Sequence, residues 1–323
     1  MAIVKGNRME MADLTTFAAV ARCEGITRAA KELHTVQSNV TNRIRALEQE
    51  VGVRLFERHS RGVVLTSAGV RLLPYAARAA ALLQEATAMA RDDGEASGTL
   101  TIGTMETTVA VRLPPVLARF SALCPAVELV VRSGPTAELV EKVLDGEIDG
   151  AFVAGPIDHP LLRVERAFEE ELVLVTSRRW PDLAALRNDR APIAALMFRT
   201  GCSYRQKLEQ LLVQLGKPAF KRLEFGSLDG ILGCVAADVG ITLLPQHVVD
   251  RSLSAADLFV HQVDVNIARA PTVFIQRREA CETSAMKAFG QCVASASGLG
   301  ASPYPVAGQN LAVHLQPGAP VAP

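Results

Sequence analysis

Residues 27–66, TRAAKELHTVQSNVTNRIRALEQEVGVRLFERHSRGVVLT, decide the fold of the N-terminal part of the chain. Thr27 is the predicted N-cap of a first short helix, in which alanines at 29 and 30 allow another helix to approach closely. Thr35 is the predicted cap of a second helix, which Gly52 ends. The apolar side chains of this second helix recur at helical spacing and form one stripe: Val40, Ile44, Leu47 and Val51.

The opposite face of the second helix carries hydrogen-bonding side chains and no carboxylate before Glu48. The DNA major groove admits an α-helix and displays donors and acceptors that amides, hydroxyls and guanidinium groups can read. The candidate base-reading residues are Gln37, Ser38, Asn39, Thr41 and Asn42.

A basic hairpin follows this helix, with Ser60-Arg61-Gly62 as its turn. Arginine at the tip of a short hairpin suits contact with DNA phosphates or with the minor groove. Each piece alone is equally consistent with surface helices and a solvated run of charge, but their order and spacing predict a winged helix-turn-helix. The candidate residues for contact with the DNA backbone are Arg45, Arg58, Ser60 and Arg61.

The run ITRAAKELHTVQSNVTNRIRALEQEVGVRLFERHSRGVVLTSAG (26–69) resembles the DNA-binding signature of the LysR-type transcriptional regulators, and the resemblance extends to about residue 295. One departure is visible, because that family often has Ser at the position of Val36 and Pro at that of Ser38. We expect this departure to move the helix cap to Thr35 and to alter which bases are read.

Length and composition set broad limits on the kind of protein. The 323 residues suffice for two or three compact units, and the net charge is zero, although basic residues outnumber acidic ones by seven to four between Thr27 and Gly62. The start of the chain lacks the pattern of a signal peptide, and no stretch of about 18 apolar residues is present. The six cysteines form no CxxC pair, so we expect a cytoplasmic protein with reduced thiols and no metal or other cofactor.

The flanks of the helix-turn-helix are predicted as follows. Residues 1–10 form a disordered leader, within which Met9, like Met11 just after it, is an alternative start. Asp13 caps a first helix that closes at Glu24-Gly25 and completes a DNA-binding domain over residues 11–66. The apolar side of that helix is Leu14, Phe17, Ala18 and Ala21.

A long helix is predicted from Ser67 to Asp92, with Thr66 at its start and a kink or an early repacking at Pro74. We interpret residues 67–97 as a dimerisation linker and hinge, as the resemblance also implies; the alternative is a core helix of the next domain. Small residues and leucines in its stripe suit an antiparallel partner helix: Leu72, Leu73, Ala76, Ala80, Leu83, Ala86 and Met89.

Residues 98–295 are predicted to alternate between strand and helix, which is typical of a parallel α/β sheet. The resemblance implies an effector domain of two lobes, similar to periplasmic solute-binding proteins: lobe 1 at about 98–168 and 270–295, lobe 2 at about 169–269. The lobes would meet near 165–172 and 260–272. The tail 296–323 is uncharged and rich in Gly, Pro and Ala, so we expect it to be disordered. Strands are predicted at 99–103, 127–132, 148–154, 172–176, 221–225, 241–244 and 272–275, and helices at 107–123, 135–146, 203–216, 228–237 and 283–293.

Several turns between these strands and helices place a hydroxyl beside a glycine or just before a helix, where backbone amides point outward and can bind a ligand. The resemblance implies that these turns surround a small organic effector, although each hydroxyl is equally suited to capping its own helix. Donor-rich walls favour an anion such as a carboxylate, while Glu106 disfavours a highly charged one. The candidate effector-binding residues are Thr104, Met105, Glu106, Thr107, Thr136, Thr200, Gly201, Cys202, Ser203, Gly226 and Ser227.

These features predict a DNA-binding regulator that is not an enzyme. The dimer would bind a dyad-symmetric site, assemble into a homotetramer and control access of RNA polymerase, with no membrane association. One alternative is a redox-sensing regulator, since a thiolate at Cys202 would lie at a helix N-terminus. From another class, a solute-binding protein or an enzyme with an N-terminal extension is the competitor, but GxSxG, GxGxxG, Walker and HExxH motifs are absent.

Overall fold

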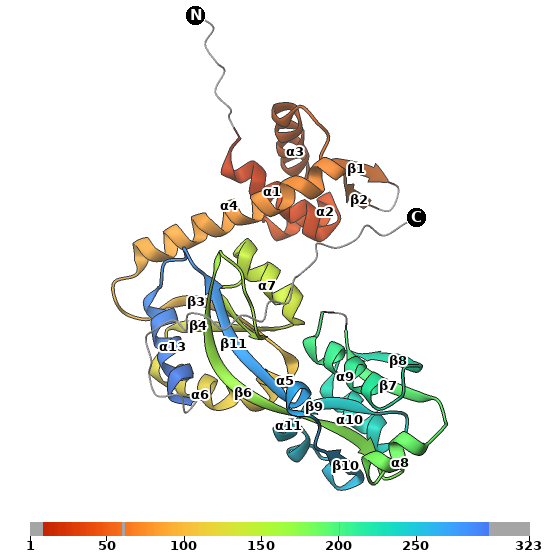
Figure 1. Ribbon diagram of the computed structural model, residues 1–323. Coiled ribbons are helices and arrows are strands. Elements are labelled where there is room, and N and C mark those ends of the chain that lie inside the picture. The colour runs from red at the N-terminus through yellow and green to blue at the C-terminus, as the bar shows by residue number, and fades with distance from the viewer. Residues whose placement is uncertain (1–8, 60–61, 200, 297–323) are drawn as a thin grey trace, which may run out of the picture. The chain divides into compact units, whose positions relative to one another are not determined.

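The computed structural model describes residues 9–59, 62–199 and 201–296 and divides near Asp93-Gly94 into two compact units (Figure 1). The predicted leader up to residue 8, the turn residues Ser60 and Arg61, the candidate Thr200 and the predicted tail from residue 297 lie outside the described residues. Of Arg58, only the backbone is described.

The first unit consists of three short helices, a β-hairpin and a long helix, in the predicted order (Figure 1). The hairpin is antiparallel, with Phe56 opposite Leu65 and His59 opposite Gly62. The prediction of a winged helix-turn-helix is confirmed. Its elements are α1 (Met11–Cys23), α2 (Ile26–Glu32), α3 (Gln37–Val51), β1 (Phe56–His59), β2 (Gly62–Leu65) and α4 (Ser67–Arg91).

The core of this unit forms where the apolar faces of α1, α2 and α3 meet the base of the hairpin. Phe17 is completely buried, and its ring lies 5.2 Å from that of Phe56. The predicted stripe of α3 is buried at 40, 44 and 47. Val51 is 37% exposed, so its assignment to the stripe was wrong: the last turn of α3 extends past the core before Gly52 ends it in the left-handed conformation.

Three predicted helix caps are wrong. α1 begins at Met11, and the Asp13 carboxylate instead accepts a hydrogen bond from Arg43 Nη1 at 2.9 Å, which joins α1 to α3. Gly25, and not Thr27, precedes α2. Val36 precedes α3, because the Thr35 hydroxyl accepts a hydrogen bond from Asn39 Nδ2 at 3.0 Å and does not cap the helix. The predicted cap of α4 is confirmed, since Thr66 Oγ1 accepts a hydrogen bond from the Gly69 amide at 3.1 Å.

Because no side chain caps the start of α3, we expect a capping residue there to stabilise the first unit. We expect Val36→Ser to raise the free energy of unfolding of the first unit by about 1 kcal/mol, because a serine hydroxyl accepts a hydrogen bond from an unpaired first-turn amide. Chemical denaturation measures the change. Val53→Ser is the matched control, since Val53 is also exposed but lies outside the helices. An equal effect of both substitutions would contradict the capping argument.

The first lobe of the second unit has three neighbouring parallel strands, with β3 between β4 and β5. The prediction of one long helix over 107–123 is wrong: the helical path is interrupted at Arg112, and two helices form. Pro114 and Pro115 fall in the first turn of the second helix, where the missing N–H costs no hydrogen bond. The elements are β3 (Gly98–Thr104), α5 (Glu106–Val111), α6 (Leu113–Leu123), β4 (Val127–Ser133), α7 (Thr136–Asp145), β5 (Gly150–Ala154) and α13 (Ser284–Ala296).

The second lobe contains several elements that the sequence pattern did not predict: α8 (Leu183–Asn188), β7 (Ile193–Phe198), α11 (Gln246–Asp250), the 3-10 helix η1 (Ala255–Asp257), β10 (Leu258–His261) and α12 (Val265–Ala268). Strands β7 and β8 are parallel. The predicted elements of this lobe are α9 (Ser203–Gln214), β8 (Phe220–Phe225), α10 (Leu228–Ala236) and β9 (Thr242–Pro245).

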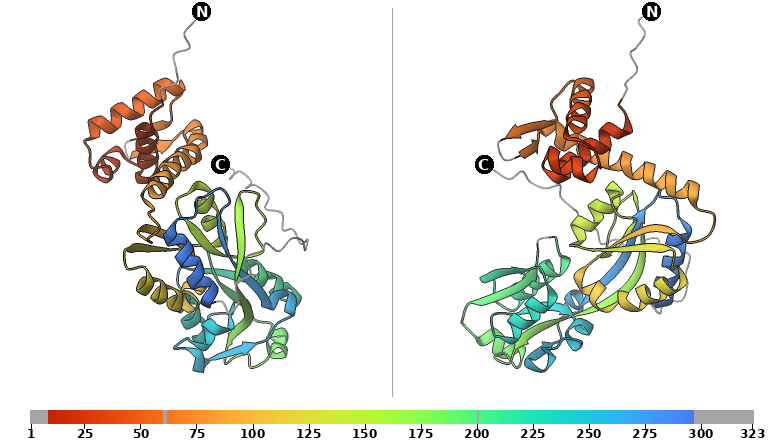
Figure 2. Two further views of the ribbon diagram at one scale, coloured as in Figure 1. Left: turned by 90° about the vertical axis from the view of Figure 1, so that its left-hand side faces the viewer. Right: turned by 180° about the vertical axis from the view of Figure 1, so that it is seen from behind.

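Two long antiparallel strands, β6 (Leu162–Ser177) and β11 (Arg269–Arg277), run side by side through both lobes (Figures 1 and 2). The strand predicted at 172–176 therefore begins much earlier, at Leu162. The sheet order is β10-β6-β11-β5-β3-β4, with β9 also paired to β6. The expectation of a parallel sheet holds for β3, β4 and β5 but not for β11, which is antiparallel to both β5 and β6. These two strands overlap the ranges where the lobes are predicted to meet, 165–172 and 260–272.

Candidate nucleic-acid interface and ligand pocket

One face of α3 is polar and exposed, opposite the side chains that enter the core. Gln37, Ser38, Asn39 and Asn42 are exposed, while Thr41 is half-buried. The side chain of Asn39 is held by its hydrogen bond to Thr35, whereas no hydrogen bond is recorded for the side chains of Gln37, Ser38 and Asn42 among the described residues. This face thus presents donors and acceptors to solvent.

The first carboxylate of α3 anchors the hairpin. Glu48 Oε1 accepts hydrogen bonds from the backbone amides of Leu55 and Phe56, at 2.8 and 3.2 Å. The two hydrogen bonds fix the start of β1 against the last turns of α3. They also hold the negative charge at the base of the hairpin.

A groove of about 390 Å³ lies between α3 and the hairpin. Arg45 and Arg54 both line it, together with Glu48 and the apolar side chains of Phe56 and Val63. Arg54 was missed as a site residue, because its place in the short segment between α3 and β1 gave no helical face to read. Two exposed guanidinium groups beside a polar helix face suit the binding of phosphates.

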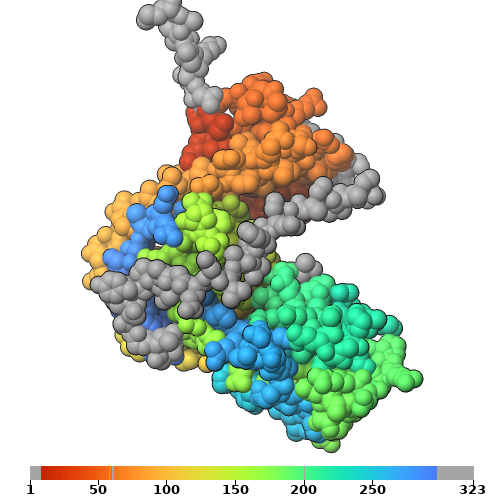
Figure 3. Space-filling model, viewed as in Figure 1, coloured from red at the N-terminus to blue at the C-terminus, as the bar shows by residue number. Residues whose placement is uncertain are grey.

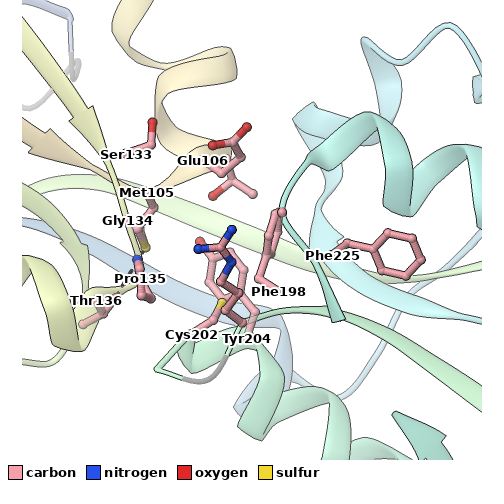
Figure 4. Close-up of a pocket in the computed structure, with 13 residues that line it drawn as sticks. Met105, Glu106, Ser133, Gly134, Pro135, Thr136, Phe198, Cys202, Tyr204 and Phe225 are labelled. Carbon is pink, nitrogen blue, oxygen red and sulfur yellow. Dashed lines mark hydrogen bonds between the residues drawn. The ribbon is translucent and has the colours of Figure 1, made fainter. Parts of the chain in front are cut away.

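A second cavity, of about 180 Å³, lies between the two lobes of the second unit (Figure 4). In the space-filling view lobe 2, in green and teal, forms a mass distinct from lobe 1 (Figure 3). Lobe 1 contributes the start of α5 and the β4–α7 turn, and lobe 2 the β7–α9 turn and the end of β8. The lining residues are Met105, Glu106, Thr107, Ser133, Gly134, Pro135, Thr136, Phe198, Arg199, Cys202, Tyr204, Phe225 and Gly226.

The structure brings six of the candidate effector residues to this pocket: Met105, Glu106, Thr107, Thr136, Cys202 and Gly226. Gly201 lies beside it, since a Cβ there would be 3.4 Å from Pro135 Cβ. Three others do not line it. Thr104 is completely buried, Ser227 caps α10 by accepting from the Gly230 amide at 3.2 Å, and the Ser203 hydroxyl is buried without a partner among the described residues.

Charges of both signs face this pocket. Glu106 is half-buried on α5, and Arg199 is exposed at the end of β7. Among the described residues, neither side chain has a recorded hydrogen bond or ion pair, either to the other or to a third group. The Arg199 guanidinium extends along Gly226, where an added Cβ would be 3.4 Å from Nη2. Sequence reasoning missed Arg199 because β7 itself was not predicted.

A buried phenol lies in the pocket wall. Tyr204 is 4% exposed, and its hydroxyl has no hydrogen-bond partner among the described residues, nor has that of Thr272. Burial raises the pKa of Tyr204 well above its ordinary value, while the nearby hydroxyls of Thr107 and Thr272 act in the opposite direction. The phenol therefore stays protonated and retains an unused donor.

Beside this phenol, a buried ion pair braces lobe 1 against the crossing strand β6. Arg112 Nε and Nη2 donate to the two carboxylate oxygens of Glu170 at 2.8 and 3.0 Å, and Nη2 also donates to the Glu169 carbonyl at 3.3 Å. The hydrogen bond from Arg112 to Glu170 raises the pKa of the guanidinium group. Glu170 is 4% exposed, so this bidentate pair is largely shielded from water.

Cys202 lies in the pocket, in surroundings that disfavour its thiolate form. Burial raises the pKa of its thiol, and this effect outweighs the backbone amides of Tyr204 and Arg205, which lower it. Cys202 packs against one core cluster of the lobe and Cys234 against another.

Within the described ranges, no group of three or more His, Cys, Asp or Glu side chains is placed to bind a metal ion. Over the same residues, none of the helices combines the length and the apolar character needed to span a membrane.

Comparison with known proteins identifies both units. The family model described as "LysR substrate binding domain" matches residues 93–298, and "Bacterial regulatory helix-turn-helix protein, lysR family" matches residues 11–70. The HTH-type transcriptional regulator GltR of Bacillus subtilis (strain 168) is 40% identical over 276 residues, which cover 85% of this chain and 93% of GltR.

Solved structures agree with this assignment. Full-length CbnR complexed with its target DNA is 26% identical, with a TM-score of 0.63 and coverage of 89% of this chain and 99% of that one. A full-length variant of OxyR from Pseudomonas aeruginosa shares the fold at 20% identity, with a TM-score of 0.67 and coverage of 90% and 96%. The winged helix-turn-helix and the two-lobed domain together make the chain a member of the LysR family of transcriptional regulators.

Proposed function

We propose that this regulator binds dyad-symmetric double-stranded DNA through α3 and the hairpin, under the control of a small organic effector in the pocket between the lobes. The observation that carries the proposal is the exposed polar face of α3 beside a groove with two arginines. The likeness to CbnR, whose structure was solved with target DNA, supports it.

Each part of the interface has a separate role. The residues for contact with base edges in the major groove are Gln37, Ser38, Asn39, Thr41 and Asn42. Arg45 and Arg54 bind phosphates from the groove, and we extend this role to the hairpin residues Arg58, Ser60 and Arg61.

The exposed apolar side chains of α4 support a homodimer. Val70, Tyr75, Leu82 and Leu83 are each more than half exposed, which is unfavourable in a helix that remains single. A partner helix packed on the side of Tyr75, Leu82 and Leu83 would pair two copies of α3 with two half-sites. Two such dimers form a homotetramer in this proposal.

Effector control follows from the position of the pocket between two lobes joined by β6 and β11. A ligand that contacts both lobes favours the closed arrangement by its differential affinity. Closure then changes how dimers pack in the tetramer, and with it DNA bending and the access of RNA polymerase. This scheme places the protein in the cytoplasm and requires no catalysis. A redox role through Cys202 has less support, because burial raises the pKa of that thiol.

A pair of substitutions tests the roles at the interface. We expect Arg45→Ala to weaken binding to all DNA sequences alike and to flatten the plot of log affinity against log salt by about 0.9 for each phosphate that is no longer neutralised. We expect Gln37→Ala to cost about 1–3 kcal/mol of discrimination at one base pair per half-site, with little change in the salt dependence.

The measurement is a fluorescence-anisotropy titration on the specific site and on random DNA at several salt concentrations. Each variant is the control for the other. A sequence-dependent loss for Arg45→Ala, or a uniform loss for Gln37→Ala, would contradict the assignment of that residue.

A further inference from the structure

The pocket between the lobes has two chemically different ends. Arg199 belongs to the β7–α9 turn of lobe 2 and Glu106 to the start of α5 in lobe 1, and both line the cavity. Neither has a recorded partner among the described residues. Two opposite charges that face one cavity without pairing are both available to a bound molecule.

The end near Arg199 suits a carboxylate. The helices α7 and α9 begin at Thr136 and Ser203 beside the cavity, and the positive ends of their dipoles favour an anion. Tyr204 also lines the cavity, and its hydroxyl is buried in the wall. These groups together form a site for one negatively charged group.

The end near Glu106 disfavours a simple carboxylate ligand. A purely anionic molecule would face a half-buried carboxylate whose charge is not compensated by any ion pair recorded in the described part of the chain. A ligand that also carries a cationic group removes this repulsion and gains a charge-assisted hydrogen bond. Phe198 and Phe225 add aromatic side chains to the lining, and aromatic rings tolerate a nearby cation.

We propose that the effector is a small amphoteric molecule of the free amino acid type, with its carboxylate on Arg199 and its ammonium group on Glu106. The inference rests on the proposed function of this pocket as the effector site. The cavity of about 180 Å³ is smaller than the pockets of roughly 300–1,000 Å³ that hold drug-sized ligands, so it favours a molecule of amino-acid size. Because the two charges belong to different lobes, such a ligand would draw the lobes together.

The test uses the full chain and titration calorimetry. Each of the proteinogenic L-amino acids is titrated, and the tightest is compared with its analogue without the amine and its analogue without the carboxylate. We expect at least one amino acid to bind, about tenfold or more tighter than either analogue, because each charged hydrogen bond that the analogue cannot form costs at least that factor.

Matched variants separate the two ends. Glu106→Gln should weaken the amino acid about tenfold or more while leaving the amine-free analogue unweakened, and Arg199→Gln should do the converse for the carboxylate-free analogue. Glu141→Gln and Arg187→Gln, exposed residues outside the pocket lining, are controls that should change neither affinity.

Two results would overturn the inference. The first is that no amino acid binds. The second is that the amine-free analogue binds wild type as tightly as the amino acid does, which would mean that Glu106 and Arg199 pair with each other when the lobes close. Either result leaves the proposed function standing if the same preparation protects a symmetric DNA site, whereas failure of DNA protection counts against the proposed function and not against the ligand class.

Discussion

Glu170→Ala is expected to lower the free energy of unfolding of the second unit by about 3 kcal/mol or more. The substitution removes both carboxylate acceptors of Arg112, whose side chain is only 26% exposed, and leaves the guanidinium group without a counter-charge, with the Glu169 carbonyl as its remaining acceptor among the described residues. The ion pair that is lost joins the end of α5 to the crossing strand β6. Its removal should therefore destabilise lobe 1 and also loosen the contact between lobe 1 and β6.

Urea denaturation measures this loss, and the neighbouring residue provides the control. Glu169 forms an exposed ion pair with Arg166, with side chains 48% and 66% exposed. Its substitution by alanine should cost less than about 1 kcal/mol, because exposed pairs are screened by water. If the two substitutions cost the same, the Arg112–Glu170 pair does not stabilise the domain.

Phe17→Ala is expected to lower the free energy of unfolding of the first unit by about 3–5 kcal/mol. The ring is completely buried and packs against Phe56 at the start of the hairpin, so its removal opens a cavity between α1 and the wing. DNA affinity should fall as well, because the hairpin loses its support.

Thermal denaturation and DNA titration of the same samples check this expectation. Phe17→Leu is the matched variant, since a smaller change of volume at the same site should cost less than about 1.5 kcal/mol. A Phe17→Ala protein with wild-type stability would show that the core of the first unit is not organised around this ring.

The sequence predicted the elements of the first unit well because their apolar residues recur at helical spacing. Residues 40, 44 and 47 enter the core as expected. The helix caps were less predictable, because a polar side chain has several partners within reach. Asp13 pairs with Arg43, which is distant in the sequence, and the Thr35 hydroxyl accepts a hydrogen bond from Asn39, so neither side chain caps a helix.

The second unit was predicted less completely. The crossing strands β6 and β11 pair across about a hundred residues of sequence, and their antiparallel direction follows from tertiary pairing that no local pattern encodes. The segment Ile193–Phe198 forms β7, but a short apolar run is ambiguous between strand and helix, and it was left unassigned.

This omission shaped the predicted ligand site. The hydroxyls singled out from the turns include Ser227, which caps its own helix, and Thr136, whose Oγ1 accepts the Ala154 amide at 3.1 Å. The charged and aromatic residues that line the pocket at the end of β7, Phe198 and Arg199, became visible only in the structure. Capping and ligand binding require the same residue types, so spacing alone did not separate them.

Footprinting on the region upstream of the gene for this chain, with a salt titration, tests the central claim most directly. The account predicts a protected, dyad-symmetric site and a binding constant that falls steeply with salt, since each phosphate contact contributes about 0.9 to the slope. Arg45→Ala should flatten that slope. Absence of protection at low salt would contradict the account, and the exposed face of α3 would then need another partner.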